Sequence, residues 1–119
     1  VIDVMEAQKD MADGSTMRRG AYPCHLDPHS TVCRAYNATP IEERHHHRYE
    51  FNNDYLDEFE AAGMRAVGMN PETGLVEVME LDNHPWFVAT QYHPEYSSNV
   101  LNPHPLFVAF VGASLANQK

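Results

Sequence analysis

The sequence is poor in cysteine, poor in basic residues and without a long apolar run. Its two cysteines, Cys24 and Cys33, are too few for a disulfide framework and fit a reducing environment, so we expect a cytoplasmic protein. No segment reaches the roughly 18 continuous apolar residues of a membrane-spanning helix, and no signal peptide is recognisable. We therefore expect no membrane partner.

The charge balance excludes a second class of partner. Eight lysines and arginines stand against 17 aspartates and glutamates, which gives a formal net charge of −9. An acidic surface repels a phosphate backbone, so we expect no nucleic-acid partner.

The length of the chain limits its organisation. At 119 residues it can form one hydrophobic core and is too short for two. It opens on Val1 rather than methionine, which we interpret as a cut inside a longer protein, although processing could give the same start. We expect residues 1–119 to form a single partial domain.

Hydrophobic periodicity and turn residues predict strands interspersed with helices, which is typical of an α/β layered fold. Pro23 is expected to end the first strand, and the turn 70–74, with its proline and glycine, predicts a hairpin. The strands are predicted over about residues 17–22, 43–51, 64–69, 75–81 and 86–89, and the helices over 31–36, 54–62 and 105–117. In the last helix we expect five buried side chains: Leu106, Phe107, Phe110, Val111 and Leu115.

The run 86–95 carries the clearest chemical signal. An apolar strand that begins with Trp86 and Phe87 is followed by His93, and Pro94 prevents a central ladder from continuing. On an extended backbone, Glu95 would lie on the same side as His93. A histidine oriented by a carboxylate is the base of nucleophilic hydrolysis, which also needs a nucleophile.

The same run resembles a known family. Gln91-Tyr92-His93-Pro94-Glu95 is similar to the His-Pro-Glu signature of class I, triad-type glutamine amidotransferases. Four further blocks resemble, in order, the glutaminase domain of the CTP synthase family: residues 17–24, 43–53, 83–88 and 104–107.

The resemblance implies an architecture and an activity. The fold would be the C-terminal half of a three-layer α/β class I glutaminase, with a mixed sheet, a hairpin and flanking helices. His93 would be the base and Glu95 its orienting carboxylate in a Cys-His-Glu triad. The intact enzyme, which we expect to be a homotetramer, would hydrolyse glutamine and use the ammonia for ATP-dependent amination of UTP to CTP. ATP, UTP and Mg²⁺ would bind in a separate synthetase domain, with no cofactor in these residues.

The nucleophilic cysteine is not recognisable in this chain. Such a cysteine sits on a strained strand-to-helix turn with small neighbours. Neither Cys24 nor Cys33 has a glycine two positions to either side. The resemblance places the nucleophile and the oxyanion hole in the half of the glutaminase domain that precedes these residues in the parent chain. We therefore expect residues 1–119 alone to be inactive.

A charged segment follows the predicted break at Pro40. If it is extended, Arg44, His46, Arg48 and Glu50 share one face, and that face is basic enough to hold a carboxylate. The resemblance assigns Arg48 to binding of the substrate glutamine. The family commonly has arginine where this chain has His46. This difference does not shift the alignment, so Arg48 still matches the family's arginine.

Three other interpretations of the sequence are a metal site, another amidotransferase and a non-catalytic module. A metal site is not expected, because adjacent histidines in the run 45–47 point to opposite faces, and the cluster around Cys24 and Cys33 lacks a CxxC pair. The chain could serve another biosynthetic amidotransferase, or it could be a non-catalytic module that keeps the fold. The longer matching blocks around Arg48 and Trp86 argue against the first of these two, whereas the absent cysteine favours the second only if the chain is complete.

Overall fold

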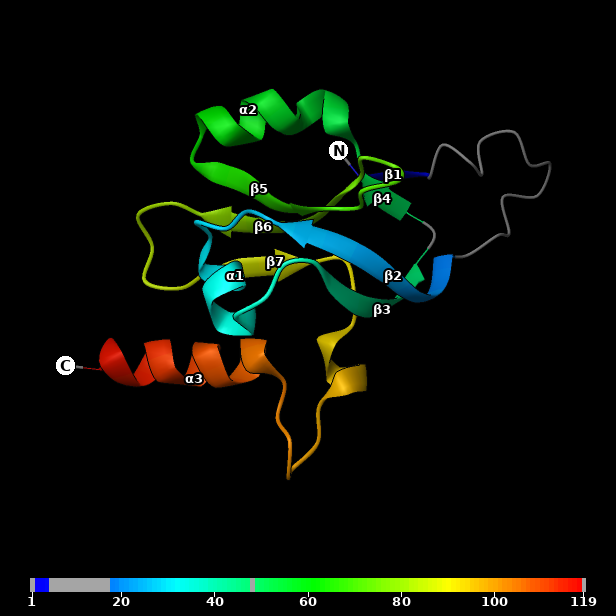
Figure 1. Cartoon of the computed structure of the whole chain (residues 1–119). Helices are drawn as coiled ribbons and strands as arrows, with labels where there is room; N and C mark the ends of the chain where they lie inside the picture. The colour runs from blue at the N-terminus through cyan, green and yellow to red at the C-terminus, as the bar shows by residue number, and fades with distance from the viewer. Residues whose placement is uncertain (1, 5–17, 48, 119) are drawn as a thin grey trace.

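A five-stranded sheet with helices on both faces organises the chain in this computed structural model, which describes residues 2–4, 18–47 and 49–118 (Figure 1). In chain order the elements are β1 (Ile2–Val4), β2 (Arg18–Leu26), α1 (Thr31–Tyr36), β3 (Ile41–His47), β4 (Tyr49–Phe51), the 3-10 helix η2 (Asn53–Tyr55), α2 (Leu56–Ala61), β5 (Met64–Met69), β6 (Val76–Leu81), β7 (Val88–Thr90), the 3-10 helix η3 (Pro94–Ser97) and α3 (Pro105–Ala116).

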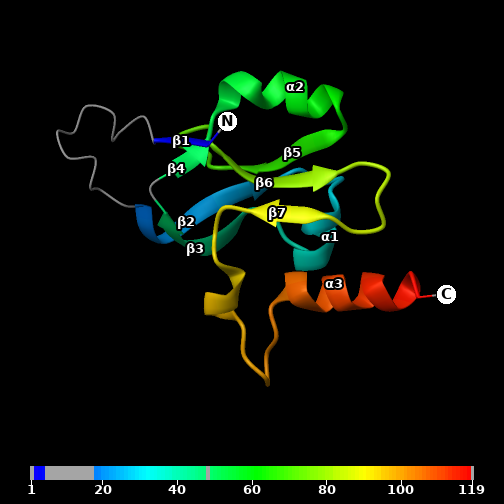
Figure 2. The same cartoon turned by 180° about the vertical axis from the view of Figure 1, so that it is seen from behind.

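The strands form one large and one small sheet. The large sheet has the order β3-β2-β5-β6-β7, and β1 pairs with β4 in the small one. Helix α2 covers one face of the large sheet, while α1 and α3 lie together on the other (Figures 1 and 2). The predicted α/β layered fold is confirmed. Every pairing between described strands is antiparallel, so the parallel pairing of a mixed sheet does not occur within this part of the fold.

Each face of the sheet has its own hydrophobic core. Under α1 and α3 lie the buried residues Cys24, Leu26, Val32, Val67, Val78, Tyr92 and Leu106. Under α2 lie Phe51, Val76 and Met79, against which Leu56 and Phe59 of that helix pack. Because the sheet is buried on both sides at its centre, β6 is nearly continuous in burial rather than alternating.

The locally encoded elements match their predictions. Ser30 caps α1 by accepting a hydrogen bond from the backbone N–H of Cys33 at 2.9 Å. Asn52 begins the helical segment that leads into α2, and Gly63 follows that helix with a φ of +98°. Strands β5 and β6 form the predicted hairpin.

The prediction that the first strand ends at Pro23 was wrong. The strand continues through Pro23 to Leu26, and Pro23 pairs with Glu42 of β3. On its other side β2 pairs with β5 only at His25 and Leu26. Proline is tolerated because, among the strands that the structure describes, only β3 lies beside β2 at this position, so a missing N–H interrupts no second ladder.

The predicted strand 43–51 is two strands in different sheets. Strand β3 is the terminal strand of the large sheet, whereas β4 pairs with β1. The expected alternation holds within β3, where Arg44 and His46 are exposed and His45 is buried. Glu50, expected on the face of Arg44 and His46, is instead buried. A single extended register does not pass from one sheet to the other.

Helix α3 corrects the predicted burial. Leu106 is buried as expected, but Phe107, Phe110, Val111 and Leu115 are 41% to 64% exposed. The helix is apolar on nearly every side and contacts α1 along one of them, so its sequence does not indicate which face packs. Phe87, expected in the sheet core, is also exposed because β7 begins one residue later.

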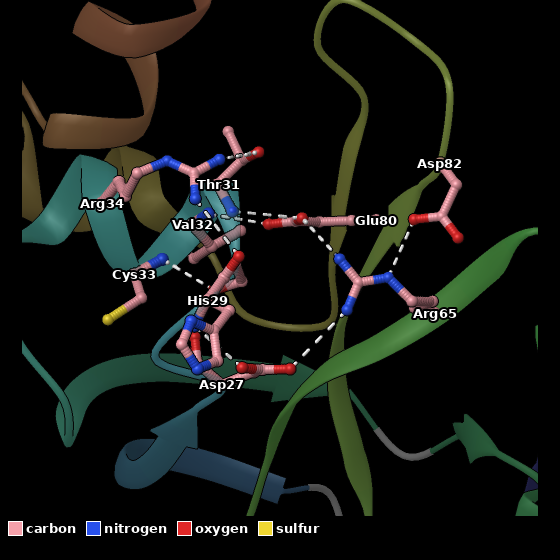
Figure 3. Close-up of polar contacts among 10 residues, drawn as sticks. Asp27, His29, Thr31, Val32, Cys33, Arg34, Arg65, Glu80 and Asp82 are labelled. Atoms are coloured by element: carbon pink, nitrogen blue, oxygen red, sulfur yellow. Dashed lines mark hydrogen bonds and ion pairs between the residues drawn. The ribbon is translucent and has the colours of Figure 1, made fainter.

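An arginine joins three acidic side chains at the end of the sheet near α1 (Figure 3). Arg65 of β5 donates from Nε to Asp82 Oδ1 at 2.8 Å and lies 3.6 Å from Asp27 and 3.8 Å from Glu80. The hydrogen bond to Asp82 is the largest cause of the raised pKa of Arg65. Glu80 also accepts from the backbone N–H groups of Thr31 (3.2 Å) and Val32 (2.7 Å). We call Arg65, Asp27, Glu80 and Asp82 the Arg65 cluster; it fastens α1 to the sheet.

Candidate active site

His93 lies just beyond the large sheet, where the chain leaves β7 and starts η3. Its backbone N–H donates to the carbonyl oxygen of Arg44 in β3 at 2.8 Å. His93 is also the residue that precedes η3, whose first residue is Pro94. The chain is therefore held to the outer strand of the sheet at the residue that carries the imidazole.

The imidazole and the carboxylate predicted to act together are in contact. His93 Nδ1 lies 2.7 Å from Glu95 Oε2, and the side chains are 36% and 55% exposed. The predicted extended backbone from His93 to Glu95 was wrong, because residues 94–97 form a 3-10 helix. The hydrogen bond from His93 is the largest cause of a lowered pKa for Glu95, which favours the ionised carboxylate.

A hollow adjoins the His93 ring. The ring stacks on Tyr96 with a centroid separation of 5.0 Å and lies 6.5 Å from the ring of His46. Tyr96 and His46, together with Arg44, line an open hollow of about 520 Å³. Tyr96 could not be predicted from the sequence, since a tyrosine in a short polar turn is most often a surface residue.

The basic segment contributes to this hollow through Arg44 and His46, both exposed on β3. A guanidinium at this position is suited to a carboxylate ligand. Arg48, the predicted glutamine contact, lies outside the described residues.

Neither cysteine lies on a strand-to-helix turn. Cys24 is in the middle of β2 and is fully buried. A Cβ atom built on Gly68 would come within 2.9 Å of its sulfur, so the neighbouring strand closes over it. Cys33 is inside α1 and approaches the carbonyl oxygen of Ala38 at 3.7 Å. These positions agree with the sequence argument that neither cysteine has the surroundings of a nucleophile.

Within residues 2–4, 18–47 and 49–118, no three histidine, cysteine or acidic side chains are grouped so that they could hold a metal ion. Over those ranges no helix has the length and apolar character needed to cross a bilayer.

The family of the chain follows from its match to a family model, glutamine amidotransferase class-I, over residues 2–113. The chain belongs to the class I glutamine amidotransferase family. It is similar over its whole length to the CTP synthase of Bacteroides thetaiotaomicron, with 59% identity over 120 residues that cover 100% of this chain and 22% of that protein. The CTP synthase of Symbiobacterium thermophilum is 53% identical over 116 residues, which cover 97% of this chain and 21% of that protein.

A solved structure has the same fold. The glutaminase domain of Trypanosoma brucei CTPS, with bound acivicin, superposes with a TM-score of 0.89 at 27% identity, covering 100% of this chain and 47% of that chain. The chain thus spans about a fifth of the length of the curated relatives it matches. The resemblance to the glutaminase domain of CTP synthases is confirmed.

Proposed function

We propose that this chain is part of the glutaminase domain of a CTP synthase, and that His93 is the general base of glutamine hydrolysis. The observation that carries the proposal is the 2.7 Å contact between His93 Nδ1 and Glu95 Oε2 beside the hollow lined by Arg44. A partly exposed imidazole with one nitrogen held by a carboxylate meets the geometric need of such a base.

The contact supports an assignment of the catalytic nitrogen. Nδ1–H donates to the Glu95 carboxylate, so the lone pair of Nε2 is the proton acceptor. Nε2 takes the proton of a cysteine thiol as the sulfur attacks the amide carbon of glutamine. It then gives that proton to the departing nitrogen, which leaves as ammonia, and a thioester remains. A water molecule activated by the same nitrogen cleaves the thioester to glutamate.

The thiol comes from another part of the polypeptide. The surroundings of Cys24 and Cys33, described above, support that assignment, as does the fifth of the relatives' length that this chain spans. The isolated chain is accordingly inactive toward glutamine. The role we propose for Arg48 is binding of the α-carboxylate of glutamine, and Arg44 supplies a positive charge at the hollow.

The complete protein uses the released ammonia to aminate UTP to CTP, with ATP and Mg²⁺ bound in a synthetase domain outside these residues. The name CTP synthase shared by the relatives supports this reaction. We assign the complete enzyme to the cytoplasm and expect it to be a homotetramer.

Replacing His93 by alanine in the complete polypeptide tests the proposal. Glutamine-dependent CTP formation should fall by about 10²- to 10⁴-fold, the usual contribution of a general base. Synthesis from added ammonia should continue at the wild-type rate, because that route bypasses amide hydrolysis. Equal losses with both nitrogen sources would remove the role assigned to His93.

A further inference from the structure

A carboxylate buried beside the His93 segment is held by neutral side chains. Glu43 of β3 is 3% exposed, and its Oε2 accepts short hydrogen bonds from the hydroxyl of Tyr36 and from Nε2 of His104. Its Oε1 accepts a long hydrogen bond of 3.4 Å from the hydroxyl of Ser97. Four elements thus meet at one carboxylate: β3, α1, η3 and the start of α3.

The orientation of the His104 ring is determined by its second nitrogen. His104 precedes α3, and its Nδ1 accepts a hydrogen bond of 3.0 Å from the backbone N–H of Leu106. The proton of the neutral ring is therefore on Nε2, which donates to Glu43. The backbone N–H of His104 donates to the hydroxyl of Ser98 at 2.9 Å.

Tyr36 extends these contacts to the residue before the catalytic histidine. Its hydroxyl lies 3.1 Å from that of Tyr92, which is 3% exposed. Because Tyr36 donates its proton to Glu43, its oxygen accepts from Tyr92. Burial is the largest cause of the raised pKa of both tyrosines, so both hydroxyls stay protonated and remain donors. We call Glu43, Tyr36, Tyr92, His104 and Ser97 the Glu43 cluster.

The Glu43 cluster reaches both ends of the segment 92–98. Tyr92 at its start is joined to Glu43 through Tyr36, and Ser97 and Ser98 at its end are joined to Glu43 and His104. Between these ends lie His93 and Glu95, whose side chains are 36% and 55% exposed. The residue after Glu43 supplies the carbonyl oxygen that accepts from the His93 N–H.

We infer that Glu43 and His104 are positioning residues for the amide-hydrolysing site: they anchor both ends of segment 92–98 to β3 and so keep the His93–Glu95 pair at the hollow. The inference rests on the function proposed above. Neither residue touches the His93 ring, and both act through the backbone of this segment.

The chemistry of the Glu43 cluster suits this task. Hydrogen bonds to a charged acceptor are roughly twice as strong as neutral ones, and burial removes the competing water. Removing the acceptor leaves the Tyr36 hydroxyl and the His104 N–H with weaker, neutral partners only: they lie 3.1 Å from each other, and Tyr36 lies 3.1 Å from Tyr92. The segment between them would move, and a displacement of about 1 Å at a catalytic group can cost 10²-fold in rate.

Glu43→Ala in the complete polypeptide is the test variant, and Glu80→Ala is its matched control. Glu80 is also a buried carboxylate, 5% exposed, and it also accepts two hydrogen bonds, but it belongs to the Arg65 cluster. Hydrogen exchange measured on peptides that cover residues 92–98 reports the anchoring directly. We expect exchange in this segment to be about 10-fold faster in Glu43→Ala and unchanged in Glu80→Ala.

Kinetics separate positioning from binding. Glu43→Ala should lower kcat for glutamine hydrolysis by about 10- to 100-fold with KM within about threefold, while ammonia-dependent synthesis is retained. Glu43→Gln keeps an oxygen that can accept from Tyr36 and His104, so it should restore most of kcat. Should Glu43→Ala fail to fold, Tyr36→Phe removes the hydrogen bond to Glu43 and the link to Tyr92 but keeps the contacts of Glu43 with His104 and Ser97, so it should give a smaller change in the same two measurements.

Three results would overturn the inference. They are unchanged exchange in segment 92–98, faster exchange with unchanged kcat, or equal effects in Glu43→Ala and Glu80→Ala. The exchange measurement does not depend on the reaction. If His93→Ala spares glutamine hydrolysis, the proposed function fails, and exchange still reports whether Glu43 anchors the segment.

Discussion

The Arg65 cluster and the Glu43 cluster differ in what surrounds the central charge. In the Arg65 cluster an arginine that is itself 37% exposed faces three acidic groups, among them Asp82 at 42%. In the Glu43 cluster a nearly inaccessible carboxylate is held by two hydroxyls and an imidazole. Solvent and salt weaken the first arrangement and hardly reach the second. The exposed pair proposed for catalysis is attached to the second, where the geometry is better defined.

The largest effect that separates the two regions should come from exposed carboxylates. Glu95→Gln keeps a hydrogen-bond acceptor for His93 but removes the charge that stabilises the imidazolium formed during thiol deprotonation. We expect kcat for glutamine hydrolysis in the complete polypeptide to fall about 100-fold. Steady-state kinetics with glutamine and with ammonia measure this loss.

Asp82→Asn is the matching change in the Arg65 cluster. Asp82 is also exposed and also paired with a basic side chain at 2.8 Å, but it lies away from segment 92–98. Its kcat should stay at the wild-type value. A comparable loss of kcat in both variants would mean that net charge, rather than the contact with His93, explains the effect.

Alkaline pH should weaken the Glu43 cluster in particular. Below pH about 10 the phenols of Tyr36 and Tyr92 are protonated in both the folded and the unfolded chain, so their contribution to stability is complete. Because burial raises their pKa only in the folded protein, the unfolded chain loses these protons first as pH rises. Stability should then fall by up to about 1.4 kcal/mol per pH unit for each tyrosine.

Denaturant unfolding followed between neutral pH and pH about 11 measures this slope. Tyr36→Phe should be less stable at neutral pH and should show a shallower alkaline loss, since one ionising group is gone. An identical slope in the wild type and the variant would contradict the assigned burial of Tyr36.

The smallest effect is expected from the Arg65 cluster itself. Arg65→Met removes ion pairs that solvent already screens, so the free energy of unfolding should fall by less than about 1 kcal/mol. The difference between wild type and variant should shrink in about 1 M salt. A loss above about 2 kcal/mol that salt leaves unchanged would show that this cluster is as well shielded as the Glu43 cluster.

Features specified by neighbouring residues could be predicted from the sequence. The cap of α1 at Ser30, the β5–β6 hairpin and the contact between His93 and Glu95 each involve residues close together in the chain. Turn and capping chemistry at these places acts over a few residues and leaves a readable pattern. The predicted roles of His93 and Glu95 remain proposals.

Features specified by distant partners could not be predicted. In the sequence, Glu43 is one charged residue in a polar segment, and His104 is the residue before a predicted helix. Nothing near either one indicates their hydrogen bond, which spans 61 positions of sequence. His104 does precede α3 as predicted, but its second hydrogen bond leaves no trace in its neighbours. The burial predicted for α3 and the strand end predicted at Pro23 were wrong for the same reason, because both depend on which other element lies alongside.

Because Gly68 lies so close to Cys24, the packing of the sheet controls whether a chemical reagent can reach this sulfur. A thiol reagent added to the folded protein meets Cys24 at 0% exposure, with the strand above it too near even for one extra methyl group. Modification at this sulfur would require β2 and β5 to separate, so its rate would count openings of the central strands. Mass spectrometry of the alkylated peptide could time those openings without any change to the sequence.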